Sequence, residues 1–200
     1  MFYDKELVAG KLRRWEKYLI EYRLPDWDSI PDFGLYMEQV LILLKDYLDY
    51  LPPELKDEEF ITAATINNYV RKKIMPEPVK KKYYRVHIAY LIMIISLKQS
   101  LSLSMLSTII PMGITEQEVK GIYEAYVDRH KIVAGHFIEE IRCLAGNILD
   151  HDVEGEMVAA DTNEVIISSA VIGGFARLLA EKLLLLEGKK PGEAGDIELG

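Results

Sequence analysis

Apolar residues recur at helical spacing through most of the chain and predict a mostly α-helical protein. In residues 4–23, for example, Val8, Leu12, Trp15 and Leu19 follow one another at intervals of three and four, which places them on one face of a helix. The same pattern predicts further helices at residues 35–51, 62–73, 85–99, from Ser102 or Ser104 to Ile110, from Thr115 to about Leu149, and 164–187.

Prolines and helix caps mark the expected ends of these helices. Pro52 and Pro53 stop the second helix, since proline cannot continue one. Thr62 is a suitable N-cap for the third helix, and Thr115 begins a capping box at the long one.

Two further prolines, Pro76 and Pro78, exclude a helix from residues 75–84, which we expect to be extended or to form a small hairpin. The fold prediction is therefore a mostly α protein with at most one small β wing. The positions of these helices and breaks divide the chain into four expected parts: residues 1–34 (an N-terminal helix and loop), 35–112 (a winged unit), 113–187 (long helices) and 188–200 (a disordered tail).

The stretch Val165–Leu186 is apolar enough to raise the question of a membrane span. Arg177, Glu181 and Lys182 interrupt it, and charges at the middle of a bilayer are costly, so we expect a helix buried by neighbouring helices, either of this chain or of a second copy. The first 25 residues lack the continuous apolar core of a signal peptide. The sequence therefore favours a cytoplasmic protein.

Composition limits the chemistry that the chain can carry. Its 200 residues are half hydrophobic, which suits one domain or two small ones, and the net charge of −8 argues against a wholly basic nucleic-acid coat. The single cysteine, Cys143, excludes an intramolecular disulfide and fits a buried thiol. We find no phosphate-binding loop, nucleophile elbow or zinc motif, and expect neither an enzyme nor a cofactor.

Metal ligation has one weak candidate. His136 lies three residues before Glu139 and four before Glu140 and would share a helix face with either of them, and His151, Asp152 and Glu154 follow in an acidic loop. This spacing is common on solvated helices, so we assign no metal site.

Positive charge is concentrated in one short segment. Residues 71–85 contain seven of the 24 Lys and Arg residues and a single acid, Glu77. A segment of +6 therefore lies within a remainder of −14, and the polyanion that it fits best is nucleic acid.

The helix predicted at residues 62–73 has the two faces that a DNA-reading helix needs. Ile66, Tyr69 and Val70 share an apolar side, whereas small and polar residues face away from it. Asparagine suits adenine and arginine suits guanine or phosphate, while a lysine run follows the phosphate backbone. We therefore expect DNA contacts from Asn67, Asn68, Arg71, Lys72, Lys73, Lys80, Lys81, Lys82 and Arg85.

An ordered set of motifs in this region resembles a known family. Thr65-Ile66-Asn67-Asn68-Tyr69, Ile74-Met75-Pro76, Lys82-Tyr83 and Ser102-Leu103-Ser104 are similar to the winged helix-turn-helix of the MerR transcription regulators. With Leu35-Tyr36-Met37-Glu38-Gln39-Val40 and Leu97-Lys98-Gln99, the set resembles a MerR-like bacterial family catalogued as domain of unknown function 1836, over about residues 24–112. The resemblance implies a regulator that binds double-stranded DNA, as a homodimer.

Two alternative functions stay open at this point. The chain could be a helical protein–protein adaptor that keeps the fold without DNA binding, or a helical domain that binds a small ligand. An exposed group formed by Asn67, Asn68, Arg71 and Lys80–Lys82 would favour DNA, and buried asparagines or a cover of acidic residues would favour the adaptor.

Overall fold

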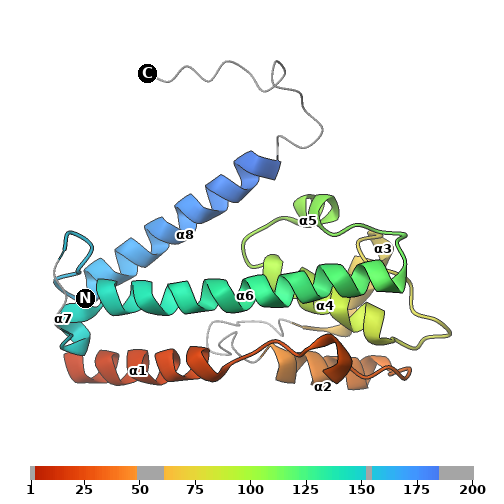
Figure 1. Cartoon of the computed structure of the whole chain (residues 1–200), viewed down its shortest axis with the longest axis horizontal. Helices are drawn as coiled ribbons and strands as arrows, with labels where there is room; N and C mark the ends of the chain where they lie inside the picture. The colour runs from red at the N-terminus through yellow and green to blue at the C-terminus, as the bar shows by residue number, and fades with distance from the viewer. Residues whose placement is uncertain (1–2, 49–60, 152–154, 185–200) are drawn as a thin grey trace, which may run out of the picture.

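The described part of the chain folds into helices and contains no β-strand. The computed structural model describes residues 3–48, 61–151 and 155–184 (Figure 1). Its elements are α1 (Lys5–Glu21), the 3-10 turn η1 (Trp27–Ser29), α2 (Met37–Tyr47), α3 (Ala63–Arg71), α4 (Arg85–Leu97), α5 (Leu103–Ile109), α6 (Glu116–Leu144), α7 (Gly146–Leu149) and α8 (Thr162–Leu184). The mostly α prediction is confirmed, and two isolated bridges, Leu35–Tyr83 and Val79–Lys82, are the β pairing that these residues form.

Capping side chains next to the first turn determine where α3, α5 and α6 begin. The Thr62 hydroxyl accepts a hydrogen bond from the Thr65 backbone N–H at 3.0 Å, and the Ser102 hydroxyl caps α5. At α6, Thr115 and Glu118 form the reciprocal capping box that their spacing predicts. The expected helix starts at these three positions are confirmed.

The long helix ends earlier than the sequence pattern predicts. We expected it to reach Leu149, but α6 stops at Leu144, and the chain turns at Ala145 into the short α7. The turn lets Ile148 and Leu149 pack with Ala9 of α1 in a small second core, which a straight helix would carry away from it. Tertiary packing therefore overrides the helical pattern here.

Helix α4 is the centre of the main core. Its nine consecutive residues from His87 to Ile95 are all buried, and α2 and α6 pack against it. Trp27 and Ile30 of the loop after α1 are buried in the same core, as their isolated apolar character predicts. In Figure 1, α3 lies toward the end of the molecule opposite α7, and α3 packs on α2.

Two tyrosine hydroxyls tie loops to this core. The Tyr123 hydroxyl donates to the carbonyl oxygen of Pro25 at 2.7 Å, and the Tyr90 hydroxyl donates to that of Pro111 at 2.6 Å. Burial raises the pKa of both phenols, so both remain neutral donors at physiological pH.

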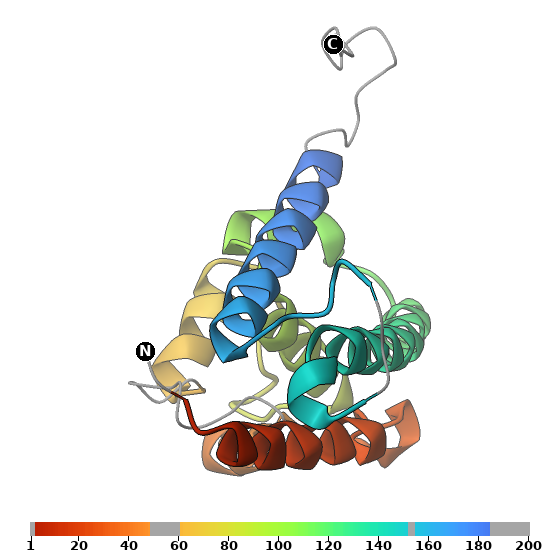
Figure 2. The ribbon, with the colours of Figure 1, turned by 90° about the vertical axis from the view of Figure 1, so that its left-hand side faces the viewer.

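The last helix corrects a prediction. We expected the apolar helix at residues 164–187 to be buried, but α8, which slants from near α7 toward α5, has no buried residue over Thr162–Glu181 (Figures 1 and 2). By length and composition alone, this segment qualifies as a membrane span. The apolar pattern correctly predicted a helix here, but the other described helices, α5 among them, contact it without burying it. The predicted tail, residues 188–200, and most of the turn after α2, residues 49–60, lie outside the described residues.

His87 links the buried helix α4 to the basic segment, residues 71–85, through hydrogen bonds at both of its ring nitrogens. Its Nδ1 accepts from the Tyr84 backbone N–H at 3.0 Å, and its Nε2 donates to the Glu77 carbonyl oxygen at 2.9 Å. We expect His87→Ala to lower the free energy of unfolding by about 2 kcal/mol, because it removes a buried ring and its two hydrogen bonds to backbone groups. Urea denaturation measures the change. His136→Ala removes an exposed imidazole and should change stability by less than about 0.5 kcal/mol. Equal effects of the two substitutions would contradict this role.

Candidate nucleic-acid interface

Helix α3 is divided into an apolar inner face and a small polar outer face. Ile66 and Tyr69 are buried, and burial raises the pKa of Tyr69 to about 12. Ala64, Asn67 and Arg71 are exposed and recur at spacings of three and four. The outer face therefore presents one small side chain, one amide and one guanidinium along a single line.

Arg71 is held on this outer face by its neighbour. Its Nη2 donates to the side-chain oxygen of Asn68 at 2.8 Å, one turn earlier. Asn68 itself is partly buried, whereas Asn67 is exposed. Of the two asparagines that the sequence singles out, Asn67 therefore has the freer approach to a ligand, and Asn68 orients Arg71.

Lys80 and Lys81 form a tight two-residue turn. Val79 and Lys82 exchange both backbone hydrogen bonds at 3.0 Å, which closes the turn between them. Lys80 has φ of 51° and Lys81 has φ of 64°, the left-handed conformations of the hairpin turn that usually carries Asn-Gly. Both lysines are exposed.

Lysine occupies strained backbone positions in this segment. Lys73, just after α3, also has a positive φ of 55°, so three of the four non-glycine residues with positive φ in the described part of the chain are lysines of residues 71–85. A side chain with a Cβ costs roughly 1–2 kcal/mol in this conformation. The chain therefore carries positive charge at positions where glycine or asparagine would relieve strain.

A short pairing anchors the turn to the core. Leu35 and Tyr83 exchange two backbone hydrogen bonds at 2.8 Å, and Tyr83 is buried. Lys82 is partly buried and its ammonium lies 5.3 Å from the centre of the Tyr36 ring. A Cβ on Gly34 would come within 2.8 Å of the Lys82 side chain, so the glycine leaves room for it.

Arg85 points into the protein and lies apart from the other predicted residues. Its Nε donates to the Ile30 carbonyl oxygen at 2.8 Å, and its guanidinium lies 5.9 Å from the centre of the Trp27 ring and 3.7 Å from Asp28. The structure thus exposes Asn67, Arg71, Lys72, Lys73, Lys80 and Lys81, partly covers Asn68 and Lys82, and engages Arg85 with the loop after α1.

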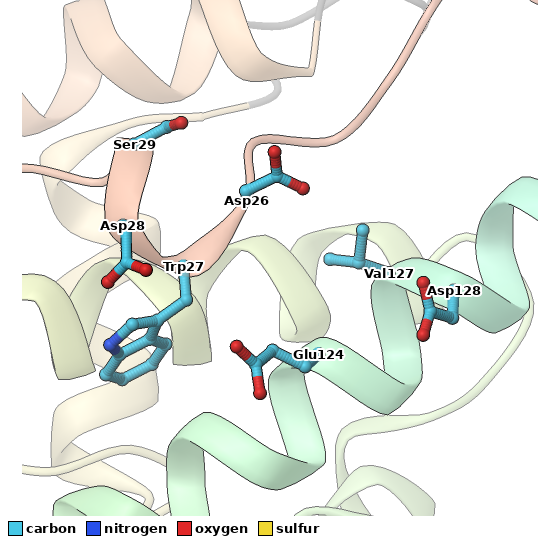
Figure 3. Close-up of a pocket in the computed structure, with 7 residues that line it drawn as sticks. All are labelled: Asp26, Trp27, Asp28, Ser29, Glu124, Val127 and Asp128. Atoms are coloured by element: carbon cyan, nitrogen blue, oxygen red, sulfur yellow. The ribbon is translucent and has the colours of Figure 1, made fainter.

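An acidic pocket lies beyond Arg85. Its cavity of about 530 Å³ lies between the loop after α1 and α6, and Figure 3 shows carboxylates from both sides; the lining residues are Asp26, Trp27, Asp28, Ser29, Glu124, Val127 and Asp128. Asp28 and Glu124 each lie within 4.0 Å of the Lys120 ammonium, which neutralises part of this charge. The pocket repels phosphate and suits a cationic group. Sequence reasoning missed it, because its two walls are about a hundred residues apart in the chain.

Comparison with known proteins places the chain in one family. The family model described as domain of unknown function (DUF1836) matches residues 25–127, just over half of the chain. No curated protein and no solved structure matches the chain. The chain belongs to the DUF1836 family, as the ordered motifs around α3 and the turn indicated.

The strain in the turn gives a prediction about stability. Replacing Lys80 with Asn and Lys81 with Gly should raise the free energy of unfolding by about 1 kcal/mol, because both new residues tolerate the left-handed backbone. Thermal denaturation at equal ionic strength measures the gain. Lys72→Gly is the matched control, since Lys72 has φ of −80° and glycine should not stabilise that position. A turn variant no more stable than the control would show that the lysines are unstrained.

Proposed function

We propose that this member of the DUF1836 family is a cytoplasmic transcriptional regulator that binds double-stranded DNA as a homodimer. The observation that supports this most is the pair of exposed lysines in a left-handed turn. A turn chosen for stability would carry glycine or asparagine there, and a turn that binds phosphate would carry lysine. The acidic remainder of the chain would confine the DNA to this segment.

In this proposal the two parts of the segment have different roles. Helix α3 enters the major groove, where Asn67 reads base edges and Arg71, oriented by Asn68, reaches guanine or phosphate. Five lysines, Lys72, Lys73, Lys80, Lys81 and Lys82, contact phosphates and add affinity more than sequence preference. Arg85 supplies positive potential but no direct contact, because its guanidinium is bonded to Ile30.

The arrangement that we propose for residues 35–112 is a MerR-like winged helix-turn-helix. Helices α2 and α3 would be its helix pair, and the turn at Lys80 and Lys81 would be the tip of a minimal wing. The contact between α2 and α3 and the Leu35–Tyr83 pairing support this assignment. Residues 113–187 would then serve dimerisation.

The acidic pocket supports one alternative, a protein–protein adaptor. A cationic segment of a partner protein could enter between Asp26 and Glu124, and the fold would then work without DNA. The adaptor predicts that substitutions in the pocket, rather than in the basic segment, abolish function.

Salt dependence tests whether the basic segment binds DNA. We expect the affinity for random-sequence duplex to fall about 500-fold when salt rises from about 50 to about 200 mM, as neutralising about five phosphates would require. The double turn variant, Lys80→Asn with Lys81→Gly, should reduce the slope of log K against log salt by about 2. Fluorescence anisotropy measures both. Absence of salt-sensitive binding at low ionic strength would overturn the proposal.

A comparison of substitutions tests the division of roles. Asn67→Ala should relax sequence preference at one or two base pairs by about 10-fold or more, whereas Lys81→Glu should weaken binding to all sequences alike. Selection from a random duplex library, followed by sequencing, measures both effects. Lys131→Glu on the exposed surface of α6 is the charge-matched control and should leave binding unchanged. Equal weakening by Lys131→Glu and Lys81→Glu would indicate a general charge effect instead.

A further inference from the structure

Two aromatic side chains are exposed beside the lysine turn. Phe33 is 63 % exposed and Tyr36 is 53 % exposed. Both belong to residues 33–36, between η1 and α2, which we call the aromatic loop. Val79, at the start of the turn, is 55 % exposed. The surface around the turn therefore combines apolar side chains with positive charge.

The aromatic loop is held directly against the turn. Leu35 and Tyr83 exchange two backbone hydrogen bonds at 2.8 Å. A Cβ on Gly34 would lie 2.9 Å from the Cβ of Lys82 and 3.0 Å from the Tyr84 ring, so glycine lets the loop approach this closely. The loop and the turn therefore form one surface, although they are far apart in the sequence.

Tyr36 is fixed in position before any ligand binds. Its backbone N–H donates to the side-chain oxygen of Gln39 at 2.9 Å, which ties it to the first turn of α2. The Lys82 ammonium lies 5.3 Å from the centre of its ring, within the range of a cation–π contact. The structure thus holds a flat aromatic ring next to an anion-binding group, and holding them in advance lowers the entropy cost of binding.

This combination of groups matches an unpaired nucleotide. Aromatic rings stack on the faces of bases, and ammonium groups bind the phosphates between them. In an intact duplex the neighbouring base pairs cover these faces, whereas a single strand exposes them. Asp32 is the one acid among residues 30–36, and the three successive lysines of the turn outnumber it, so the surface keeps a net positive charge.

A protein partner fits this surface less well than a nucleic acid does. Lysine is depleted at protein–protein interfaces, yet three lysines adjoin the two rings here, and Lys80 and Lys81 are exposed. An intact duplex would use the lysines but not the faces of the rings. A single strand uses both.

We propose that the aromatic loop and the lysine turn together bind single-stranded DNA. Phe33 and Tyr36 stack on unpaired bases, while Lys80, Lys81 and Lys82 bind the phosphates beside those bases. The strand that they hold continues from the duplex that α3 reads, at a place where the duplex ends or is open.

This inference rests on the proposed function, since the same turn serves the duplex, but the two can fail separately. A protein that binds a single strand and no blunt duplex would overturn the proposed regulator and leave the stacking site standing. A protein that binds a blunt duplex and gains nothing from a single-stranded tail would overturn the stacking site alone. Binding of neither would overturn both.

Fluorescence anisotropy with two probes tests the stacking site. One probe is a blunt random-sequence duplex, and the other is the same duplex with a single-stranded tail of about six nucleotides. We expect the wild-type protein to bind the tailed duplex about 10-fold more tightly, and Phe33→Ala or Tyr36→Ala to remove that preference without weakening binding to the blunt duplex. Tyr36→Phe keeps the ring and should keep the preference.

Two controls separate stacking from charge and from general damage. The loss caused by Phe33→Ala should be the same at about 50 and about 200 mM salt, because stacking on a base releases no counterions. Leu7→Ala is the matched substitution, since Leu7 of α1 is 69 % exposed, and it should keep the preference for the tail. Circular dichroism checks that the variants stay folded. A preference that survives both alanine substitutions in the aromatic loop, or that Leu7→Ala removes equally, would overturn the site.

Photochemical crosslinking locates the contact directly. When iodouracil in the tail is irradiated within the complex, it forms covalent bonds to an aromatic side chain that stacks on it. We expect mass spectrometry to find the crosslink on Phe33 or Tyr36. Crosslinks that fall only outside the aromatic loop would overturn the proposal.

Discussion

The complete burial of α4 is the constraint on which the rest of the fold depends. Nine successive buried residues leave no side of this helix for water, so other helices and loops must cover it all round. Each large aliphatic side chain buried in this way contributes about 1.5–3 kcal/mol to stability. The polar exception, His87, satisfies both of its ring nitrogens with backbone groups.

The first turn of α4 also orients the surfaces that carry charge. His87 holds the segment before the turn through Glu77, while Arg85 holds the loop after α1 through Ile30. The basic turn and the acidic pocket are therefore both fixed relative to α4. A basic turn and an acidic pocket held at fixed positions would orient the protein toward a polyanion, and the same rigidity would hold α3 in position to read it.

Much of this fold follows from local signals, and what does not follow depends on distant contacts. Thr62 and Thr115 are N-caps that can be recognised from the residues next to them, and Pro76 and Pro78 exclude a helix just before Lys80. The break at Ala145, however, depends on packing against α1. For the candidate site, the exposed lysines were predictable, whereas the left-handed turn and the inward direction of Arg85 were not.

The exposure of α8 shows a different limit of sequence reasoning. Its apolar pattern indicates burial but does not say by what, and the described residues cover only its ends. A homodimer, as proposed above, would set two basic segments at a fixed separation, as a DNA reader with two half-sites requires.

Chemical-shift mapping tests the central claim, that α3 and the lysine turn form the DNA-binding surface, most directly. Backbone amide resonances of the isotope-labelled protein would be followed while a short random-sequence duplex is added at low salt. We predict that the largest changes fall on residues 63–73 and 79–82, while residues 26–29 and 124–128 around the acidic pocket stay unchanged. Changes confined to the pocket, or none at all, would contradict the account.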